Sequence, residues 1–536
     1  MDRRSFLLAG SAGAAALLGT AAGWRHLHEI PVNVHAPGRI EGHFLRDRKA
    51  LPAPAYEVDI DVAIFGSGVA GLTAAWKLAR EGHRRFLVFD GPQAYGNAAG
   101  GNHGGIAYPT GAHYLPLPST ESLHIRELLH DLGILLRNPS AEQPYYDERC
   151  ILHAPQERVL FGGRWQEGIL PKEGLPQWEL DEHERFAQLV ERFRSARGSD
   201  GRRAFVIPAA MSSADPQWRA LDRITFRQWA ERENFRSPTL HWYLDYCCRD
   251  DYGAGRGDVS AWAGLHYFCS RGGAAENAGH GEWLTWPGGL HPLAAMMDKA
   301  AGQRRRIGSV ASLHVTSRGV EALCFEYVGG SVRSFIVKAR KAVCAMPLFV
   351  ASRVFDLRAY GFNGEQDLPT YAPWLVSNFL MKRFPQELPE QPLSWDNVVY
   401  QGRGLGYVVS THQDIRVTPP EKTVFTAYAA LDQLSPAAAR KWLETVSPDA
   451  LLDYAASDLR QVYGHAFARC VERADLTLRP HAMASPRPGF LSNKGLQALR
   501  DADGPVLFAH ADLSGFSVFE EAAWWGYQAA LRILAA

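Results

Sequence analysis

Three glycines and one acidic residue have the spacing of a dinucleotide-binding turn. Gly66, Gly68 and Gly71 follow an apolar run at 62–65 and precede a helical pattern, and Asp90 ends the next apolar run. In such a unit the first glycine permits a tight turn, the second lets the backbone approach a diphosphate, and the third allows close helix–strand packing. The acid can accept a hydrogen bond from a ribose hydroxyl. This order predicts a dinucleotide site; an ordinary strand–helix–strand crossover is the alternative.

Two further segments are expected to bring the backbone close to a ligand. Residues 96–105 contain too many glycines for a packed helix, and they lead to the turn Gly111-Ala112-His113. At the other end of the chain, an apolar run at 505–509 passes through a polar turn into a helical stretch at 519–534. A turn between a strand and a helix directs free N–H groups towards a ligand.

The length and composition of the chain are those of a large globular protein that can position these turns. Its 536 residues exceed what one hydrophobic core usually supports. Lys+Arg and Asp+Glu both total 57, so no net charge favours nucleic acid. The seven cysteines have no metal-binding spacing, and HExxH, paired CxxC and GxSxG motifs are absent from the sequence. We therefore expect no metal site, no nucleic-acid partner and no α/β-hydrolase chemistry.

The N-terminus resembles a twin-arginine export signal. Arg3-Arg4-Ser5-Phe6-Leu7 precedes an apolar, small-residue run that ends near Ala22. Residues 1–23 are predicted to be this signal, recognised by the twin-arginine export machinery, and 24–55 a linker or an arm wrapped over the body. The protein is then periplasmic or otherwise exported, or membrane-anchored if the signal stays uncleaved. A merely apolar N-terminus is the alternative.

A β-meander is predicted in the second half of the chain. Two β-runs, Ala322–Tyr327 and Val332–Val337, are separated by a glycine pair, which indicates a hairpin. A short buried strand at 342–346 follows and ends at Pro347. Residues 119–281 and 351–475 mix strands with amphipathic helices and contain no repeat.

Three separated segments together resemble the flavin-containing amine oxidase superfamily, which includes protoporphyrinogen oxidases and phytoene-desaturase-like enzymes. They are the opening glycine unit, the meander ending in Ala345-Met346-Pro347, and the tail FAHADLSG…EEAAWWGYQAA. The likeness covers about residues 57–118, 282–350 and 500–536. It implies an α/β fold with a two-dinucleotide, Rossmann-like FAD-binding domain, discontinuous at 56–118, 282–350 and 476–536, and an α+β substrate domain at 119–281 and 351–475.

The resemblance also assigns roles to residues. In this family the first glycines and the acid, here Gly66, Gly68, Gly71 and Asp90, hold the ADP part of non-covalent FAD. The cofactor residues that it implies further along the chain are Gly100 and Gly101 in the second glycine motif, Val310 near adenine, Asp512 at the polar chain, and Ser514, Gly515 and Phe519 on the isoalloxazine side. His113, His510 and Trp525 are the catalytic candidates. Alternatively, a histidine in a glycine turn can simply form hydrogen bonds with the backbone, and Trp525 can be a residue of the hydrophobic core.

The chain departs from the family pattern at three places. The second glycine motif usually reads Arg-x-Gly-Gly-Arg, but residues 98–102 lack both arginines. The tail usually reads Phe-Ala-Gly-Glu, but His510 and Ala511 replace its last two residues. Many amine-oxidising members place a lysine beside flavin N5, for which Lys382 is the nearest candidate.

Three functions remain open from the sequence. The first is an exported FAD-dependent oxidoreductase that oxidises a small amine of polyamine or amino acid type, with oxygen or an electron carrier as acceptor. The second is a desaturase or protoporphyrinogen-oxidase-like activity on a larger apolar substrate. The third is a flavoprotein with a non-catalytic binding or assembly role. The oligomeric state is not predicted.

Overall fold

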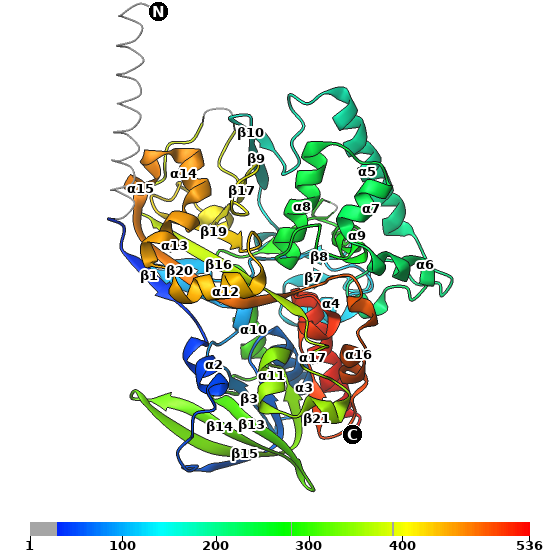
Figure 1. Ribbon diagram of the computed structural model, residues 1–536, viewed down its shortest axis with the longest axis vertical. Coiled ribbons are helices and arrows are strands. Elements are labelled where there is room, and N and C mark those ends of the chain that lie inside the picture. The colour runs from blue at the N-terminus through cyan, green and yellow to red at the C-terminus, as the bar shows by residue number, and fades with distance from the viewer. Residues whose placement is uncertain (1–28, 280, 389–390) are drawn as a thin grey trace, which may run out of the picture.

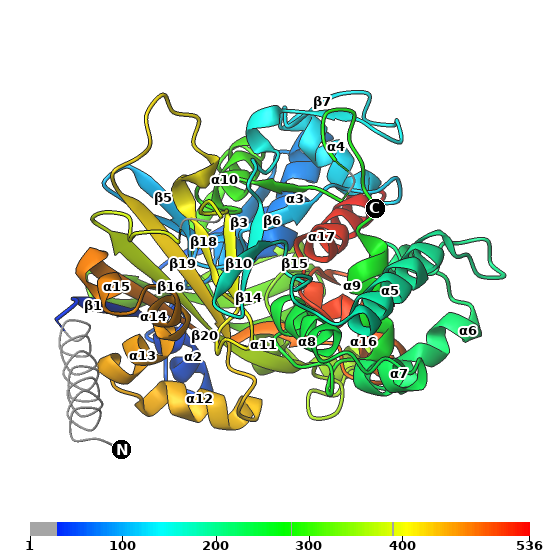
Figure 2. The same cartoon turned by 90° about the horizontal axis from the view of Figure 1, so that it is seen from above.

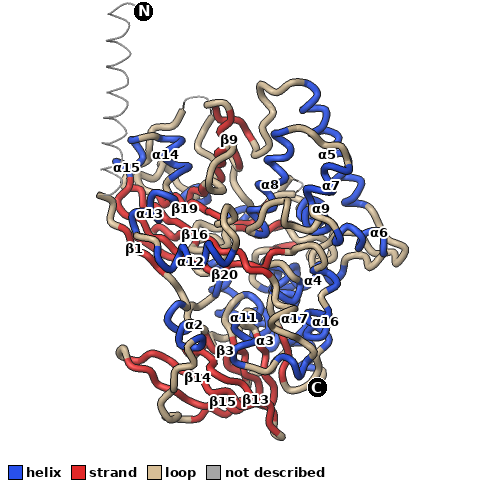
Figure 3. The backbone as a smooth tube through the Cα atoms, in the orientation of Figure 1, coloured by secondary structure: helices blue, strands red, loops and turns tan. Residues whose placement is uncertain are grey.

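Two β-sheets with their helices form the body of the protein. The computed structural model describes residues 29–279, 281–388 and 391–536, so the predicted export signal lies outside the described residues. Figure 1 shows one sheet with β13, β14 and β15 at the bottom and a second with β16, β19 and β20 above it, and the strands form two separate groups in Figure 3. Within the described ranges, no helix is both long and apolar enough to cross a membrane.

The lower sheet has a parallel centre. Its strands lie in the order β12-β3-β2-β15-β14-β13, with β21 beside β15. β2 (Glu57–Phe65) runs parallel to β3 (Phe86–Asp90) and to β15 (Ser331–Cys344), and its last four residues are buried, as the apolar run predicts. The other strands are β12 (Arg305–Ile307), β13 (Ser309–Thr316), β14 (Gly319–Val328) and β21 (Val506–Phe508).

Helix α3 (Val69–Arg80) packs against α17 (Phe519–Leu534) and α10 (His291–Ala300). The approach of α3 to α17 is close: a Cβ atom on Gly526 would lie 2.1 Å from the Ala70 carbonyl oxygen. The other helices around this sheet are α2 (Arg39–Arg46), α4 (Leu123–Asp131), α11 (Leu348–Val354) and α16 (Lys494–Asp501). This is the α/β, Rossmann-like architecture predicted from the sequence.

The upper sheet has eight strands in the order β1-β20-β16-β19-β18-β17-β9-β10. Its centre is β16 (Thr370–Met381), which is antiparallel to β19 (Thr423–Ala430) and to β20 (Val471–Ser485). The outer strands are β1 (Val32–His35), β9 (Glu157–Phe161), β10 (Arg164–Glu167), β17 (Asp396–Val399) and β18 (Tyr407–Val409).

Two groups of helices flank the upper sheet, and Figure 2 shows them at opposite sides of the molecule. One group is α12 (Pro436–Thr445), α13 (Pro448–Ala455), α14 (Ser457–Tyr463) and α15 (His465–Cys470). The other is α5 (Gln177–Ser195), α6 (Pro216–Arg219), α7 (Phe226–Arg232), α8 (Pro238–Tyr252) and α9 (Ala261–Ser270), around an aromatic core. Short strand pairs complete the fold: β4 (Gly100–His103) with β5 (Ile106–Pro109), β6 (Tyr114–Pro116) with β11 (Trp283–Thr285), and β7 (Leu135–Arg137) with β8 (Tyr145–Tyr146).

The structure differs from the sequence prediction at two element boundaries. The second hairpin strand and the short strand at 342–346 form one continuous strand, β15, which ends at Cys344. The predicted return to the FAD-binding domain at residue 476 falls inside β20, which pairs with β16 as far as Ser485. Pro480 disfavours a strand locally, but the register shift between Ala372 and Trp374 of β16 accommodates it. In the predicted arm, β1 adds to the upper sheet beside β20.

Candidate functional site

Three parallel strands end at the same edge of the lower sheet and bring their following turns together. The Ala345 amide donates to the Phe65 carbonyl at 2.9 Å, and the Ala509 amide donates to the Cys344 carbonyl at 3.0 Å. The turns after β2, β15 and β21 are therefore neighbours. The carboxyl edge of a parallel sheet is the usual place for a ligand in such folds.

The three glycines after β2 have three different reasons to be glycine. Gly66 has φ +119°, and a Cβ atom there would lie 2.5 Å from the Ala345 carbonyl oxygen. A Cβ atom on Gly71 would lie 1.8 Å from the Gly66 carbonyl oxygen, so this glycine allows the helix to pack on the strand. A Cβ atom on Gly68 would meet no atom within 4 Å. The open space at Gly68 is where the sequence places a diphosphate.

The polar groups of this turn suit a diphosphate. The amides of Ser67 and Gly68 donate to no acceptor in the described parts of the chain. The Ser67 hydroxyl oxygen is buried and also has no hydrogen-bond partner. These groups lie at the N-terminus of α3, where free N–H groups and a partial positive charge favour an anion. The turn therefore fits the cofactor predicted for it.

The different surroundings of Gly68 and Gly71 predict different effects of an added methyl group. Gly68→Ala places its Cβ in open space at an ordinary φ of −69°. We expect it to leave the melting temperature of the cofactor-free protein unchanged and to weaken FAD binding at least about 10-fold, a loss of about 1.4 kcal/mol. Gly71→Ala must displace backbone, so we expect a less stable protein even without cofactor. Calorimetry and FAD titration of both variants separate the two effects; equal melting temperatures would contradict the packing argument.

Asp90, the predicted ribose acceptor, lies at the end of β3 and binds Arg305. The two Asp90 oxygens accept from the Arg305 Nη1 at 3.0 and 2.8 Å, and Arg305 also donates from Nε to Asp298 at 2.8 Å. A carboxylate has about four lone-pair sites, so Asp90 can still accept from a ribose hydroxyl. The pairing with Arg305 fixes the direction in which the carboxylate faces.

The second glycine segment meets the first at Gly96 rather than at Gly100 and Gly101. A Cβ atom on Gly96 would lie 3.4 Å from the Gly68 Cα, and the φ of Gly96 is +57°. Gly100 and Gly101 lie in β4, where a Cβ atom would collide with His291 and with the Tyr108 ring, respectively. Packing accounts for glycine at these two positions, and Gly96 is the residue of this segment that adjoins the Gly66–Gly71 turn.

His113 lies in an aromatic box made of Tyr114, Trp395 and Tyr428. Its ring stacks on Tyr428 at 4.5 Å between centroids and lies 5.3 Å from Trp395 and 5.0 Å from Tyr114. The Tyr428 hydroxyl donates to the Gly111 carbonyl at 3.0 Å, which fixes the box on the Gly111–His113 turn. Burial lowers the pKa of His113 to about 3, so the imidazole is neutral at pH 7.

The C-terminal turn is held by its own side chains. The Ser514 hydroxyl donates to Glu521 and accepts from the Trp525 indole N–H at 2.8 Å, and Glu521 also accepts from the Ala209 amide at 2.6 Å. Burial raises the pKa of Glu521 to about 7. Trp525 belongs to the core of the lower sheet, which gives it a packing role; its predicted catalytic role stays a prediction.

The other residues predicted in this region are also well packed. Val310 lies in the same core, and Phe519 packs with residues of α3 and α4. Gly515 has φ +84° and ends the turn with a hydrogen bond from its amide to the Asp512 carbonyl at 2.9 Å. The Nδ1 atom of His510 lies 3.1 Å from the Asp512 amide nitrogen and 3.2 Å from the Asp512 Oδ1. His510 therefore caps the turn.

Three carboxylates that the sequence did not predict lie together next to the aromatic box. Glu157 begins β9 and Asp396 begins β17, and the two are paired in register across these parallel strands. Asp250 of α8 accepts from the Tyr114 hydroxyl at 3.5 Å and interacts electrostatically with both other acids. We call Glu157, Asp250 and Asp396 the acid cluster. All three side chains are half-buried.

The acid cluster is not ion-paired with a cation in the described ranges, although Arg271 and Arg249 lie close enough to attract the charge of Asp250. None of its members forms an ion pair with a lysine, arginine or histidine in the described ranges, and the nearby Arg271 pairs with Asp251 instead. Burial, followed by repulsion from Asp250 and Glu282, raises the pKa of Glu157 to about 7; burial and repulsion from Asp251 raise that of Asp250 to about 7. Burial raises the pKa of Asp396 well above its ordinary value. Like charges opposite each other in a sheet destabilise it, so this arrangement calls for a cationic ligand.

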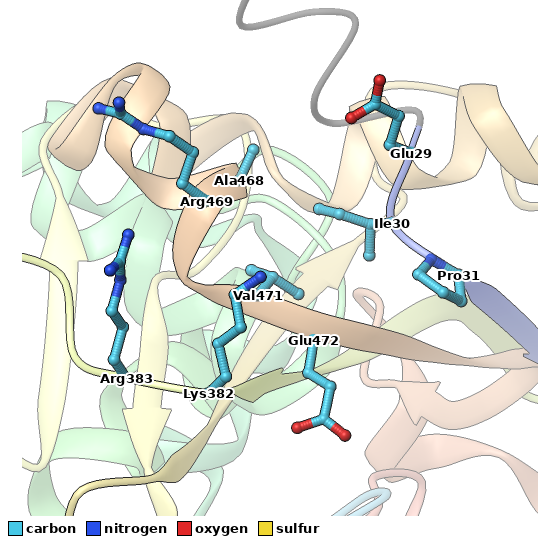
Figure 4. Close-up of a pocket in the computed structure, with 9 residues that line it drawn as sticks. All are labelled: Glu29, Ile30, Pro31, Lys382, Arg383, Ala468, Arg469, Val471 and Glu472. Atoms are coloured by element: carbon cyan, nitrogen blue, oxygen red, sulfur yellow. The ribbon is translucent and has the colours of Figure 1, made fainter.

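Lys382, the candidate for a lysine beside the flavin, lies on the outer surface. It follows the end of β16 and lines a surface pocket of about 550 Å³ with Arg383 and Arg469 (Figure 4). Among the described residues, no lysine forms a hydrogen bond or an ion pair with the aromatic box or the acid cluster.

Comparison with known proteins agrees with this architecture. A family model described as an NAD(P)-binding Rossmann-like domain matches residues 64–132, and no curated protein matches the chain in sequence. Wild-type putrescine oxidase bound to putrescine aligns with a TM-score of 0.59 at 15% identity over 90% of this chain and 100% of its own. Cyclohexylamine oxidase from Brevibacterium oxydans IH-35A gives 0.60 at 19% over 89% and 99%, and a fatty acid isomerase from P. acnes gives 0.59 at 14% over 88% and 98%. Over most of its length, the chain therefore has the fold that these two amine oxidases share with a fatty acid isomerase.

Proposed function

We propose that the chain is an FAD-dependent oxidoreductase that oxidises a small amine of polyamine type. The observation that carries this proposal is the acid cluster beside the aromatic box, without an ion-paired cation in the described ranges. Polyamines are protonated at neutral pH, so their ammonium groups complement buried carboxylates, and aromatic faces attract cations. An amino acid substrate would bring its own carboxylate against three acids, which favours a polyamine between the two amine types.

The chain's own residues have defined tasks in this proposal. The free amides of Ser67 and Gly68 would hold the diphosphate of FAD, and the cradle at Gly68 leaves room for it. Bound FAD would supply the chemistry, by accepting a hydride from the C–H bond next to the substrate nitrogen. The box around His113 would orient that part of the amine and exclude water, while the acid cluster would hold a distal ammonium group. A non-covalent cofactor is proposed because the seven cysteines are buried thiols and none lies in the C-terminal turn.

A larger apolar substrate, as in a desaturase or a protoporphyrinogen-oxidase-like enzyme, has less support. It would leave the acid cluster without a cationic partner, at a cost of several kcal/mol for each carboxylate that stays ionised. The electron acceptor of the proposed enzyme is oxygen or an electron carrier.

The absorbance spectrum under anaerobic conditions tests the function. The purified protein is expected to show the bands of oxidised flavin, and 1,4-diaminobutane is expected to bleach them. Bleaching by an apolar polyene or a tetrapyrrole but by no amine would replace the proposal with the second function. A flavin that no substrate class reduces would favour the non-catalytic role, and a colourless protein that binds no added FAD would refute cofactor and activity together.

We also propose export by the twin-arginine route, on the basis of the N-terminal sequence alone. Changing Arg3 and Arg4 together to lysine is expected to keep the protein in the cytoplasm at unchanged expression. Cell fractionation with an antibody measures this, and a variant that still reaches the periplasm would contradict the proposed route.

A further inference from the structure

A guanidinium group from the upper sheet reaches the glycine segment that adjoins the Gly66–Gly71 turn. Arg479 of β20 donates from Nη1 to Asn97 Oδ1 at 2.9 Å and to Gln93 Oε1 at 3.2 Å. Its Nε donates to the Thr110 carbonyl at 2.8 Å. Asn97 follows Gly96, the residue whose Cβ would lie 3.4 Å from the Gly68 Cα. The guanidinium group of Arg479 is thus placed beside the segment that adjoins the Gly66–Gly71 turn of the lower sheet.

The segment that receives Arg479 has no charge of its own. From Gly91 to Asn102 the chain contains neither a basic nor an acidic residue. A dinucleotide diphosphate carries two negative charges, and the backbone amides at Gly68 neutralise them only in part. A cation must therefore come from elsewhere in the fold. Arg305 contacts this segment at Tyr95, but it is paired with Asp90 and Asp298. Arg479 contacts the segment through Gln93 and Asn97 and also reaches Thr110 beyond it.

The charge of Arg479 is also unbalanced. Within the described ranges it forms no ion pair with a carboxylate, and its partners are amide, carbonyl and hydroxyl oxygens. Burial lowers the pKa of Arg479 to about 10, so the group is still charged at pH 7. An arginine has five N–H donors; four are engaged here, and the contact of Nη2 with the Thr110 hydroxyl is long, at 3.5 Å. A half-buried cation with a spare donor and no ion-paired counter-charge favours an anion next to it.

We propose that Arg479 is a cofactor-binding residue, which supplies from the substrate domain the positive charge that the second glycine segment lacks, and that its anion is the diphosphate of FAD. This inference rests on the proposed FAD binding. It makes cofactor affinity depend on the contact between the two domains, because β20 belongs to the upper sheet and Asn97 to the loop after β3.

Binding of FAD and of ADP to the cofactor-free protein tests the assignment. Arg479→Gln is expected to weaken both ligands about 10- to 100-fold, the range for a hydrogen bond to a charged group. Arg479→Lys keeps the charge and loses the guanidinium donors. Its affinities for FAD and ADP are expected to lie between those of the wild-type protein and those of Arg479→Gln. Arg473→Gln is the matched control: Arg473 lies on the same strand, pairs with Asp475 and is expected to leave both affinities unchanged. Circular dichroism and melting of each variant show whether it is folded.

The outcomes separate this inference from the function on which it rests. ADP carries the diphosphate without the flavin ring, so a variant that loses FAD affinity and keeps ADP affinity would place Arg479 at the ring and overturn the proposal. Unchanged affinity for both ligands would overturn it as well, while FAD binding by the wild-type protein would leave the proposed function intact. A wild-type protein that binds neither ligand would overturn both.

Discussion

Changing Asp250 and Asp396 together to asparagine is expected to lower kcat/KM for 1,4-diaminobutane by at least about 100-fold, with less than about a 10-fold loss for butylamine. A hydrogen bond between a carboxylate and an ammonium group contributes about 1.5–3 kcal/mol. Butylamine has no second ammonium group, so it cannot lose this interaction. Steady-state kinetics with both amines at pH 8 measure the difference.

The control for this pair is Asp258→Asn, which removes an exposed carboxylate that pairs with Arg487. We expect its kinetics with both amines to equal those of the wild-type protein. Flavin content must also stay the same in all variants. A double variant that loses diamine and monoamine activity equally would mean that the acids shape the pocket without binding a distal ammonium group, and would argue against the polyamine assignment.

The raised pKa values give the acid cluster a pH dependence. Glu157 and Asp250 have pKa values of about 7, against about 4 for unfolded chains. Below pH 6 both are largely protonated and attract a dication weakly, so kcat/KM for the diamine is expected to rise as the pH passes through about 7. The cluster-independent monoamine should show a smaller rise over the same range.

The same shifts predict how stability changes with pH. Between about pH 4 and pH 7 the unfolded chain releases these protons while the folded chain keeps them, so the cofactor-free protein loses stability as the pH rises through this window. Above about pH 7 both states are ionised, and the full cost of the buried charges is present. The double asparagine variant is therefore expected to melt at a higher temperature than the wild-type protein at pH 8, and 1,4-diaminobutane is expected to stabilise only the wild-type protein.

The part of the site that was predictable from the sequence is the part that is local in the chain. Gly66, Gly68 and Gly71 lie within six residues, and each has the surroundings that its place in the motif implies. The hairpin around Gly329 was predictable for the same reason, since the pattern and the turn residues stand next to each other. The cofactor role of Gly100 and Gly101 stays a prediction, and the structure adds a second reason for glycine at both positions, because a Cβ atom would collide with His291 or with the Tyr108 ring.

The acid cluster could not be predicted because nothing in the sequence brings its members together. Glu157, Asp250 and Asp396 lie on three elements, and only the parallel pairing of β9 with β17 places two of them in register. Each acid alone resembles an ordinary polar residue at a strand start or in a helix. Arg479 was missed for a related reason: the motif lost its arginines locally, and the charge that we assign in their place comes from a strand of the other domain.

Replacing Asp512 with alanine is expected to destabilise the protein in the absence of FAD, by about 2–5 kcal/mol. Its Oδ2 accepts from the Tyr371 hydroxyl at 2.6 Å and from the Leu348 amide at 2.9 Å. Although burial alone would raise the pKa of Asp512, His510 and these hydrogen bonds hold it below the ordinary value. Alanine leaves two buried donors from β16 and the start of α11 without an acceptor. Melting of the cofactor-free protein measures the loss.

This experiment separates two roles for the residue. The family resemblance implies that Asp512 contacts the polar chain of FAD, and a residue with that task alone would leave the cofactor-free melting temperature unchanged while FAD affinity fell. The contacts of Asp512 connect the C-terminal turn with one strand of the upper sheet, so we expect the cofactor-free protein to melt lower. Tyr371→Phe removes a single donor and should cost about 0.5–1.5 kcal/mol. Asp501→Asn, an exposed acid near the same turn, should change nothing. If Asp512→Ala left the melting temperature unchanged and reduced FAD affinity, the structural role would be contradicted and Asp512 would have only the cofactor-contact role.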